Sequence, residues 1–438
     1  MNSEFQRNVW LELTPLRLIV LCALLALAFF AAALTDGFAG TGTVARWLFV
    51  IVVVIWGTHN AARSVVGEIQ GRTWDSQRLS SLGAGTMMWG KLFGSTVFNW
   101  VGGAIFLVVI VAETADRAGI VAALYEFAFC IAMGVIAQAA SLLASLIAAR
   151  RRQGRTQFEV FLYQIVGIVA AVAVMEIADP NGPPVVLFSR ADTLLWWGQS
   201  VPAPAFLLGS LAVFTAWILT GCYRQMRLEL KLSNGPYVWL GFLVFATGYA
   251  AGFGAGGPFD EVTRRLIYAA ATAAGLAYAM AILEPKARVQ LRWLGGELGK
   301  LHLGTVLTHL QAWMMSYIAA VLLAVALLVH LGLQGLGAEQ AATGAALGFV
   351  TRDMGLIVLL NMLVWRRGGD LMAIAVLILL YALLPAIIAG LHYGTGQALF
   401  LVRQTDPLWF SPAAAWLEAI AVWVVAITTL SLPEESKT

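Results

Sequence analysis

Long apolar runs separated by short polar intervals make up almost the whole chain. Charged residues, glycines and prolines delimit these runs. Twelve runs can be counted, at residues 18–34, 45–59, 93–112, 120–149, 160–177, 203–222, 237–256, 266–283, 312–329, 344–365, 371–391 and 413–430. A helix rises about 1.5 Å per residue, so about 20 apolar residues cross the hydrocarbon core of a bilayer. The pattern predicts an all-α, polytopic membrane protein with about twelve transmembrane helices.

The composition excludes the soluble classes. Of 438 residues, 60% are hydrophobic and 12% are charged, and the mean hydropathy is +0.81. Soluble domains carry about 25% charged residues, so a water-soluble core could not absorb this much apolar sequence. Outer-membrane barrels are also excluded, because their strands alternate over about ten residues whereas these runs are unbroken.

Three polar intervals interrupt the pattern in ways that suggest structure. Residues 1–17 place apolar and charged side chains on different helical faces, which predicts an interfacial helix before an uncleaved first span. Prolines and glycines in residues 178–202 predict a broken hairpin with a short interfacial piece at 194–197. The Ser-Asn-Gly-Pro sequence at 233–236 predicts a boundary between two six-span halves, residues 1–231 and 232–438.

Charge placement predicts the orientation. Twelve spans put both termini on one side of the membrane. If both termini lie in the cytoplasm, only seven of the 27 Lys and Arg residues lie in outer segments. These are Arg46, Arg117, Arg190, Arg264, Arg265, Arg352 and Arg403. Short cytoplasmic loops carry an excess of Lys and Arg. We therefore expect a multi-pass protein of a bacterial inner membrane with both termini in the cytoplasm.

The motifs give no catalytic, metal or cofactor site. Residues 85–91 have the GxxxxGK spacing of a phosphate-binding loop, but Leu92 stands where Ser or Thr would bind magnesium, and no strand precedes the loop. The three cysteines lie inside apolar runs, and there is no CxxC or HExxH sequence. We expect no enzyme activity, no nucleic-acid partner and no ATPase in this chain.

The polar interval at residues 67–91 resembles a known segment. Its motifs are Gly67-Glu68, Gly71-Arg72-Thr73, Arg78-Leu79-Ser80-Ser81-Leu82 and Gly90-Lys91-Leu92. They are similar to the segment between spans 2 and 3 of type-2 ABC transporter permeases, although here Arg72 separates the glycine from the threonine. Residues 1–17 and 178–202 match that family's interfacial helix and outer hairpin by position. The resemblance covers about residues 1–231, and the remaining spans resemble extended bacterial members.

The resemblance implies the permease of an exporter. This permease would lie in the lipid bilayer beside a second permease copy or paralogue, and it would bind a separate ATPase carrying ATP and Mg. The ATPase contacts it implies are Glu68, Gly71, Arg72, Thr73, Arg78, Leu79, Lys91, Arg150, Arg151, Arg152 and Arg155. Two simpler interpretations stay open. Residues 67–91 could be a solvated loop, and the arginines at 150–155 could be a positive-inside anchor.

Polar residues inside the runs are further candidates, because charges are costly in hydrocarbon. The candidates are Glu126, Arg352, Asp353 and Asn361. Adjacent helix residues point about 100° apart, so Arg352 and Asp353 should each find a partner on another span. A buried structural network and a cargo pathway both fit. Asn99, Gln138, Gln164 and Asn361 are expected to tie helices together by hydrogen bonds.

Two rival functions remain. A secondary transporter of twelve spans often carries a GxxxDRxGRR-like loop and deep midplane charges. A lipid-modifying membrane enzyme would need clustered His, Asp or Glu at one membrane face. The sequence shows neither pattern, and it does not indicate the transported molecule.

Overall fold

The computed structural model describes residues 2–80, 82–150, 157–178, 193–253, 259–286, 288–363, 369–391, 394–402 and 407–431. Nearly all of these residues are helical. Within this part of the chain the strands are β1 (Thr193–Trp196) and β2 (Gln199–Pro202), which pair in one small sheet. Two compact units are formed, Met1–Leu194 with Ser200–Asn234, and Leu195–Gln199 with Gly235–Thr438.

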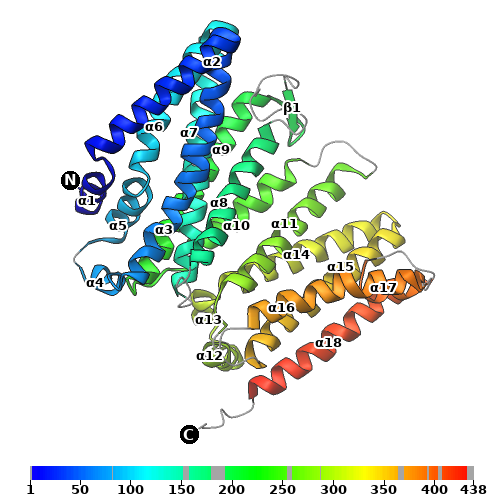
Figure 1. Cartoon of the computed structure of the whole chain (residues 1–438). Helices are drawn as coiled ribbons and strands as arrows, with labels where there is room; N and C mark the ends of the chain where they lie inside the picture. Colours follow the sequence, from blue (N-terminus) through cyan, green and yellow to red (C-terminus); the bar gives the residue numbers. More distant parts are fainter. Residues whose placement is uncertain are drawn as a thin grey trace. The chain divides into compact units, whose positions relative to one another are not determined.

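The first unit begins with a short helix and continues into long ones (Figure 1). Its helices are α1 (Ser3–Glu12), α2 (Pro15–Phe49), α3 (Gly57–Gln70), α4 (Trp74–Arg78), α5 (Ala84–Trp89), α6 (Val97–Ala118), α7 (Ile120–Arg150), α8 (Gln157–Ala178) and α9 (Ala203–Glu229). Two wide π-helical turns, η1 (Val50–Trp56) and η2 (Gly90–Gly94), join α2 to α3 and α5 to the residues before α6. At Gly37 φ is +63°, and the ribbon that rises through α2 returns toward α3.

The second unit has the same helical character. It contains α10 (Tyr237–Ala251), α11 (Glu261–Leu283), α12 (Arg288–Gly299), α13 (Leu303–His309), α14 (Ala312–Leu333), α15 (Gly337–Leu363), α16 (Gly369–Ile378), η3 (Leu379–Leu383), α17 (Leu384–Gly390), η4 (Gly394–Leu399) and α18 (Phe410–Ser431). Extensive packing joins α15 to α18 and α11 to α14.

Ten helices in the described residues are long and apolar enough to cross a membrane. Two shorter apolar helices, Glu159–Met175 and Tyr237–Ala251, fall where the sequence predicts two further spans. The protein is therefore a polytopic helical membrane protein, and the count of about twelve spans stays a prediction. The piece at residues 194–197 lies mostly in strand β1, and its place at the membrane interface stays a prediction.

The wide turn η1 explains how the helices of the first unit are held together. Carbonyl groups in a membrane must be paired inside the protein. The turn η1 keeps backbone bonds, among them Gly57 N to Val52 O, and the Thr58 hydroxyl donates to Ile55 O. Three side-chain amides add further bonds to its carbonyls. Asn99 donates to Val52 O at 2.8 Å, Gln138 to Val53 O at 2.9 Å and Gln164 to Ile55 O at 2.9 Å.

These three bonds confirm the prediction that Asn99, Gln138 and Gln164 tie helices together, since they come from α6, α7 and α8. Among the described residues, no hydrogen bond of this kind is found for Asn361, and its role as a tie between helices stays a prediction. Its amide donates to Ile357 O, one turn earlier in its own helix, at 2.9 Å. Asn361 instead packs closely against Gly369, where an added Cβ would lie 2.8 Å from the Asn361 Cα.

Helix α8 approaches α7 closely at Gly167. A Cβ added there would lie 2.5 Å from the Ala137 backbone oxygen and 2.7 Å from the Thr58 Cγ2. We expect Gly167→Ala to lower the free energy of unfolding by about 1–3 kcal/mol through overpacking. Thermal unfolding of the purified protein in detergent measures the change.

Gly209→Ala is the matched control, because position 209 is also inside a helix but has nothing within 4 Å of an added Cβ. The two variants gain the same helix propensity. Equal stability of the two variants would contradict the close approach of α7 and α8.

Candidate functional site

Helix α1 is fixed to the segment that precedes α6. Asn2 caps α1 through its side-chain oxygen, and its Nδ2 donates to Thr86 O at 2.7 Å. Gly90 and Gly94 make room for α1, because a Cβ at Gly90 would lie 2.5 Å from the Glu4 Cγ and one at Gly94 would lie 2.9 Å from the Asn8 Cβ. Small residues four apart let helices approach in this way.

This docking assembles four charged side chains, which we call the Glu68 cluster: Glu4, Arg7, Glu68 and Lys91. Arg7 Nη2 lies 3.0 Å from Glu4 Oε1 and 2.7 Å from Glu68 Oε1. Lys91 Nζ lies 3.6 Å from Glu4 Oε1 and 3.8 Å from Glu68 Oε1, and it donates to Ser64 O at 3.2 Å. The cluster has two positive and two negative groups, so its charges balance.

Lys91 is the most buried member, with 1% of the residue exposed. Burial lowers the pKa of its ammonium group, and the carboxylates of Glu4 and Glu68 oppose that shift. Its Nζ also lies 5.2 Å from the centre of the Trp74 ring. Lys91 therefore holds α1 and α3 together and is not available as a direct contact for another protein.

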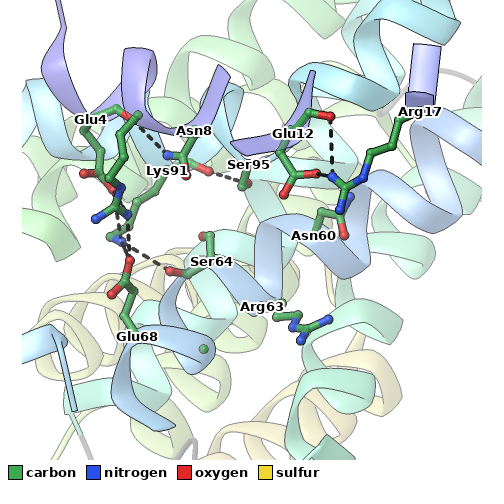
Figure 2. Close-up of a pocket in the computed structure, with 12 residues that line it drawn as sticks. Glu4, Asn8, Glu12, Arg17, Asn60, Arg63, Ser64, Glu68, Lys91 and Ser95 are labelled. Carbon is green, nitrogen blue, oxygen red and sulfur yellow. Dashed lines mark hydrogen bonds and ion pairs between the residues drawn. The ribbon is translucent and has the colours of Figure 1, made fainter. Parts of the chain in front are cut away.

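A polar pocket of about 470 Å³ opens beside the Glu68 cluster (Figure 2). Residues of α1, α2, α3 and η2 line it, together with Ser95. Arg17 Nη1 pairs with Glu12 Oε2 at 2.7 Å on one side of the pocket. Arg63 lines the same pocket, and Figure 2 draws no bond from its guanidinium.

Short helix α4 has one buried and one exposed side. Trp74 is buried and donates from Nε1 to Glu229 Oε2 at 3.3 Å, and Arg78 Nε donates to Glu229 O at 2.9 Å. Both bonds fix α4 to the end of α9. On the other side Leu79 is 88% exposed, and so is the side chain of Asp75.

The turn before α4 explains the unusual arginine at 72. Helix α3 ends at Gln70, and Arg72 follows with φ +57°, a left-handed conformation. Thr73 N then donates to Glu68 O at 2.9 Å, and the Thr73 hydroxyl bonds the Glu68 carboxylate. A left-handed residue of this kind commonly ends a helix. The inserted residue therefore makes the reversal from α3 to α4.

The residues that the family resemblance implies thus fall into three groups. Glu68 and Lys91 belong to the Glu68 cluster, and Gly71, Arg72, Thr73, Arg78 and Leu79 form the turn, α4 and the residue after it. Arg150 ends α7, whereas Arg151, Arg152 and Arg155 lie outside the described residues. Sequence reasoning missed Glu4, Arg7, Trp74 and Glu229. The Gly90/Gly94 spacing was the one signal for α1 docking.

Glu126 belongs to a second buried group, which we call the Arg46 cluster. Arg46 Nε lies 2.6 Å from Glu126 Oε1, and Arg46 Nη2 lies 2.5 Å from Glu113 Oε2. Thr114 bonds both Arg46 and Glu126. All three charged residues are buried. The cluster joins α2, α6 and α7, so the partners of Glu126 come from two other helices of the same unit.

Arg352 and Asp353 lie in a third group, the Arg352 cluster, in the middle of α15. Asp353 Oδ2 accepts from Tyr278 at 2.6 Å and from Tyr381 at 2.5 Å. Arg352 Nη1 pairs with Glu418 Oε2 at 2.6 Å. The prediction that each has a partner on another helix is confirmed. They also pair with each other, at 2.9 Å, because the long arginine side chain returns to its neighbour.

In the described residues no group of three His, Cys, Asp or Glu side chains could hold a metal ion. Comparison with family models, with curated proteins and with solved structures gives no match to this chain. The likeness to type-2 permeases therefore depends on the sequence motifs alone.

Replacement of Lys91 tests whether the Glu68 cluster holds α1. In Lys91→Met the Glu4 and Glu68 carboxylates lose the ammonium group, so we expect the backbone amides of α1 to exchange about tenfold faster with solvent. Hydrogen–deuterium exchange of the full chain in detergent measures this. Lys300→Met is the control, since Lys300 is largely exposed. Unchanged protection of α1 would show that other contacts hold it.

Replacement of Asp353 tests the Arg352 cluster. Asp353→Asn leaves the buried Arg352 without its fully buried counter-charge, and we expect a loss of about 3 kcal/mol in unfolding free energy. Glu418→Gln should lower the melting temperature less, because the Glu418 side chain is 35% exposed. Melting temperatures in detergent compare the two, and an equal or smaller effect of Asp353→Asn would contradict this ranking.

Proposed function

We propose that the chain is the membrane-spanning subunit of an ABC transporter of the exporter type. A separate ATPase that binds ATP and Mg would drive it from the cytoplasm, and a second permease copy or paralogue would complete the assembly. The protein would lie in a bacterial inner membrane with both termini in the cytoplasm. The many apolar helices support the membrane location, and the motifs of residues 67–92 support the family.

The observation that carries the proposal is the two-sided character of α4. A chain that is moved by a separate ATPase needs a segment that touches the partner and is fixed to the spans. Trp74 and Arg78 fix α4 to the end of α9 through Glu229. Leu79 and Asp75 remain exposed on the other side. The segment thus offers a contact surface on a firmly held support.

The support extends to two spans. Thr73 connects α4 to the end of α3 through Glu68, and α5 packs against α9. Glu68 is in turn held by Arg7 of α1. Force applied at Leu79 would therefore reach α3 and α9 together. This changes the choice of test residues, because a charge reversal at Glu68 would break the internal Glu68 cluster as well as any contact.

Purification from the native host provides the first test. The wild-type chain, in mild detergent, should recover a protein with a complete Walker A loop. Leu79→Asp should then lower its recovery at least tenfold, because a charge would replace an exposed apolar contact. Leu333→Asp is the control, since Leu333 is 83% exposed at the end of α14, on the side expected to face outward.

Two outcomes count against the proposal. Absence of an ATPase with the wild-type chain under stabilising conditions removes its main support. Equal loss of the partner in Leu79→Asp and Leu333→Asp would mean that α4 is not the contact.

A secondary transporter is the second candidate, and the Arg352 cluster favours it. Ionisable residues in the middle of a span often mark substrate or ion pathways. Arg352 and Asp353 of α15 are both buried, and Arg352 Nη2 has no hydrogen-bond partner among the described residues. Transport by the purified chain in vesicles under an ion gradient, without ATP, would support this candidate over the ABC permease.

A further inference from the structure

The polar pocket contains one positive charge that the protein does not neutralise. Arg7 and Lys91 are balanced by Glu4 and Glu68, and Arg17 is balanced by Glu12. Arg63 remains. Among the described residues, no hydrogen bond or ion pair of its guanidinium is found, and this exposed residue lines the pocket. The pocket therefore carries a net charge of about +1 and suits one anion.

Arg17 offers a second set of free donors in the same pocket. Its three hydrogen bonds, to Leu11 O, Glu12 O and Glu12 Oε2, all use Nη1. The Nη2 atom of Arg17 therefore has no hydrogen-bond partner among the described residues. In Figure 2, Arg17, Asn60 and Arg63 are drawn on the opposite side of the view from Glu4 and Glu68. Guanidinium groups recognise phosphate oxygens through paired N–H donors, so this side of the pocket suits a phosphate group.

Helices α1 and α2, which line the pocket, also expose apolar side chains, and these indicate the source of the phosphate. Trp10 of α1 is 77% exposed, and Leu11 is also exposed. Leu16 and Ile19 continue the exposed apolar surface along α2. Tryptophan is enriched at headgroup depth in membranes, with aliphatic residues in the acyl region. The helices that line the pocket therefore expose a surface suited to lipid chains next to a cavity suited to a charged headgroup.

We propose that this pocket binds the phosphate group of an anionic phospholipid, with Arg63 as its main contact and Arg17 as the second. The cavity of about 470 Å³ is within the range of small-ligand sites. Basic pockets between membrane helices on the cytoplasmic side bind acidic headgroups. A choline headgroup fits less well, because its own positive charge meets Arg17 and Arg63. The site requires only that the chain spans a membrane and is independent of the ABC proposal.

Lipid retention by the full chain tests the proposal. The purified protein is delipidated in mild detergent, mixed with phosphatidylglycerol or phosphatidylcholine of the same acyl chains, and examined by native mass spectrometry. We expect preferential retention of one phosphatidylglycerol. Arg63→Gln should weaken this binding about tenfold, since a charge-assisted phosphate contact is lost.

Arg72→Gln is the matched control, because it removes the same charge from an exposed arginine outside the pocket. Arg63→Gln should melt at the wild-type temperature without lipid, since Arg63 makes no bond within the described chain. Equal lipid retention by Arg63→Gln and the wild type would overturn the site. Displacement of the lipid by millimolar inorganic phosphate would overturn the assignment to a lipid, because a soluble phosphate compound would then be the ligand.

Discussion

The carbonyl groups of the wide turn η1 must be paired inside the protein, because hydrocarbon offers them no partner. Besides their local bonds, three of these carbonyls accept from Asn99, Gln138 and Gln164, which come from three different helices. The turn η1 lies in the second span, Gly40–Gln70. Each amide must lie at a definite height beside this span, so the three bonds fix the positions of α6, α7 and α8 around it. Apolar packing alone is less directional and would allow these helices to slide.

The same span is also held near both ends by charges. Arg46 lies at its beginning in the Arg46 cluster, and Glu68 lies at its end in the Glu68 cluster. Between them the amide bonds hold the middle. Span 2 is thus connected along its whole length to its neighbours. A rigid connection of this kind is what the proposed role of α4 requires, because α4 follows α3 directly.

The sequence predicted what depends on local pattern and missed what depends on distant partners. Unbroken apolar runs were sufficient to locate the helices, and the cost of a buried charge was sufficient to select Glu126, Arg352 and Asp353. The pairing of Lys91 with Glu4 could not be foreseen, since they are 87 positions apart in the chain and no local pattern links them. The π-helical turns were also missed, because the same apolar residues suit an α-helix.

Docking of α1 on Gly90 has a consequence for the biogenesis of the protein. The bonds that receive α1 come from residues 82 to 84 positions later in the chain. During synthesis α1 is therefore complete well before Thr86 and Gly90 leave the ribosome. Two apolar segments must enter the membrane in the interval, and α1 has to wait with Glu4 and Arg7 unsupported by Lys91. Assembly of the first unit is thus ordered, and α1 reaches its place only after the segment around Gly90 has been made.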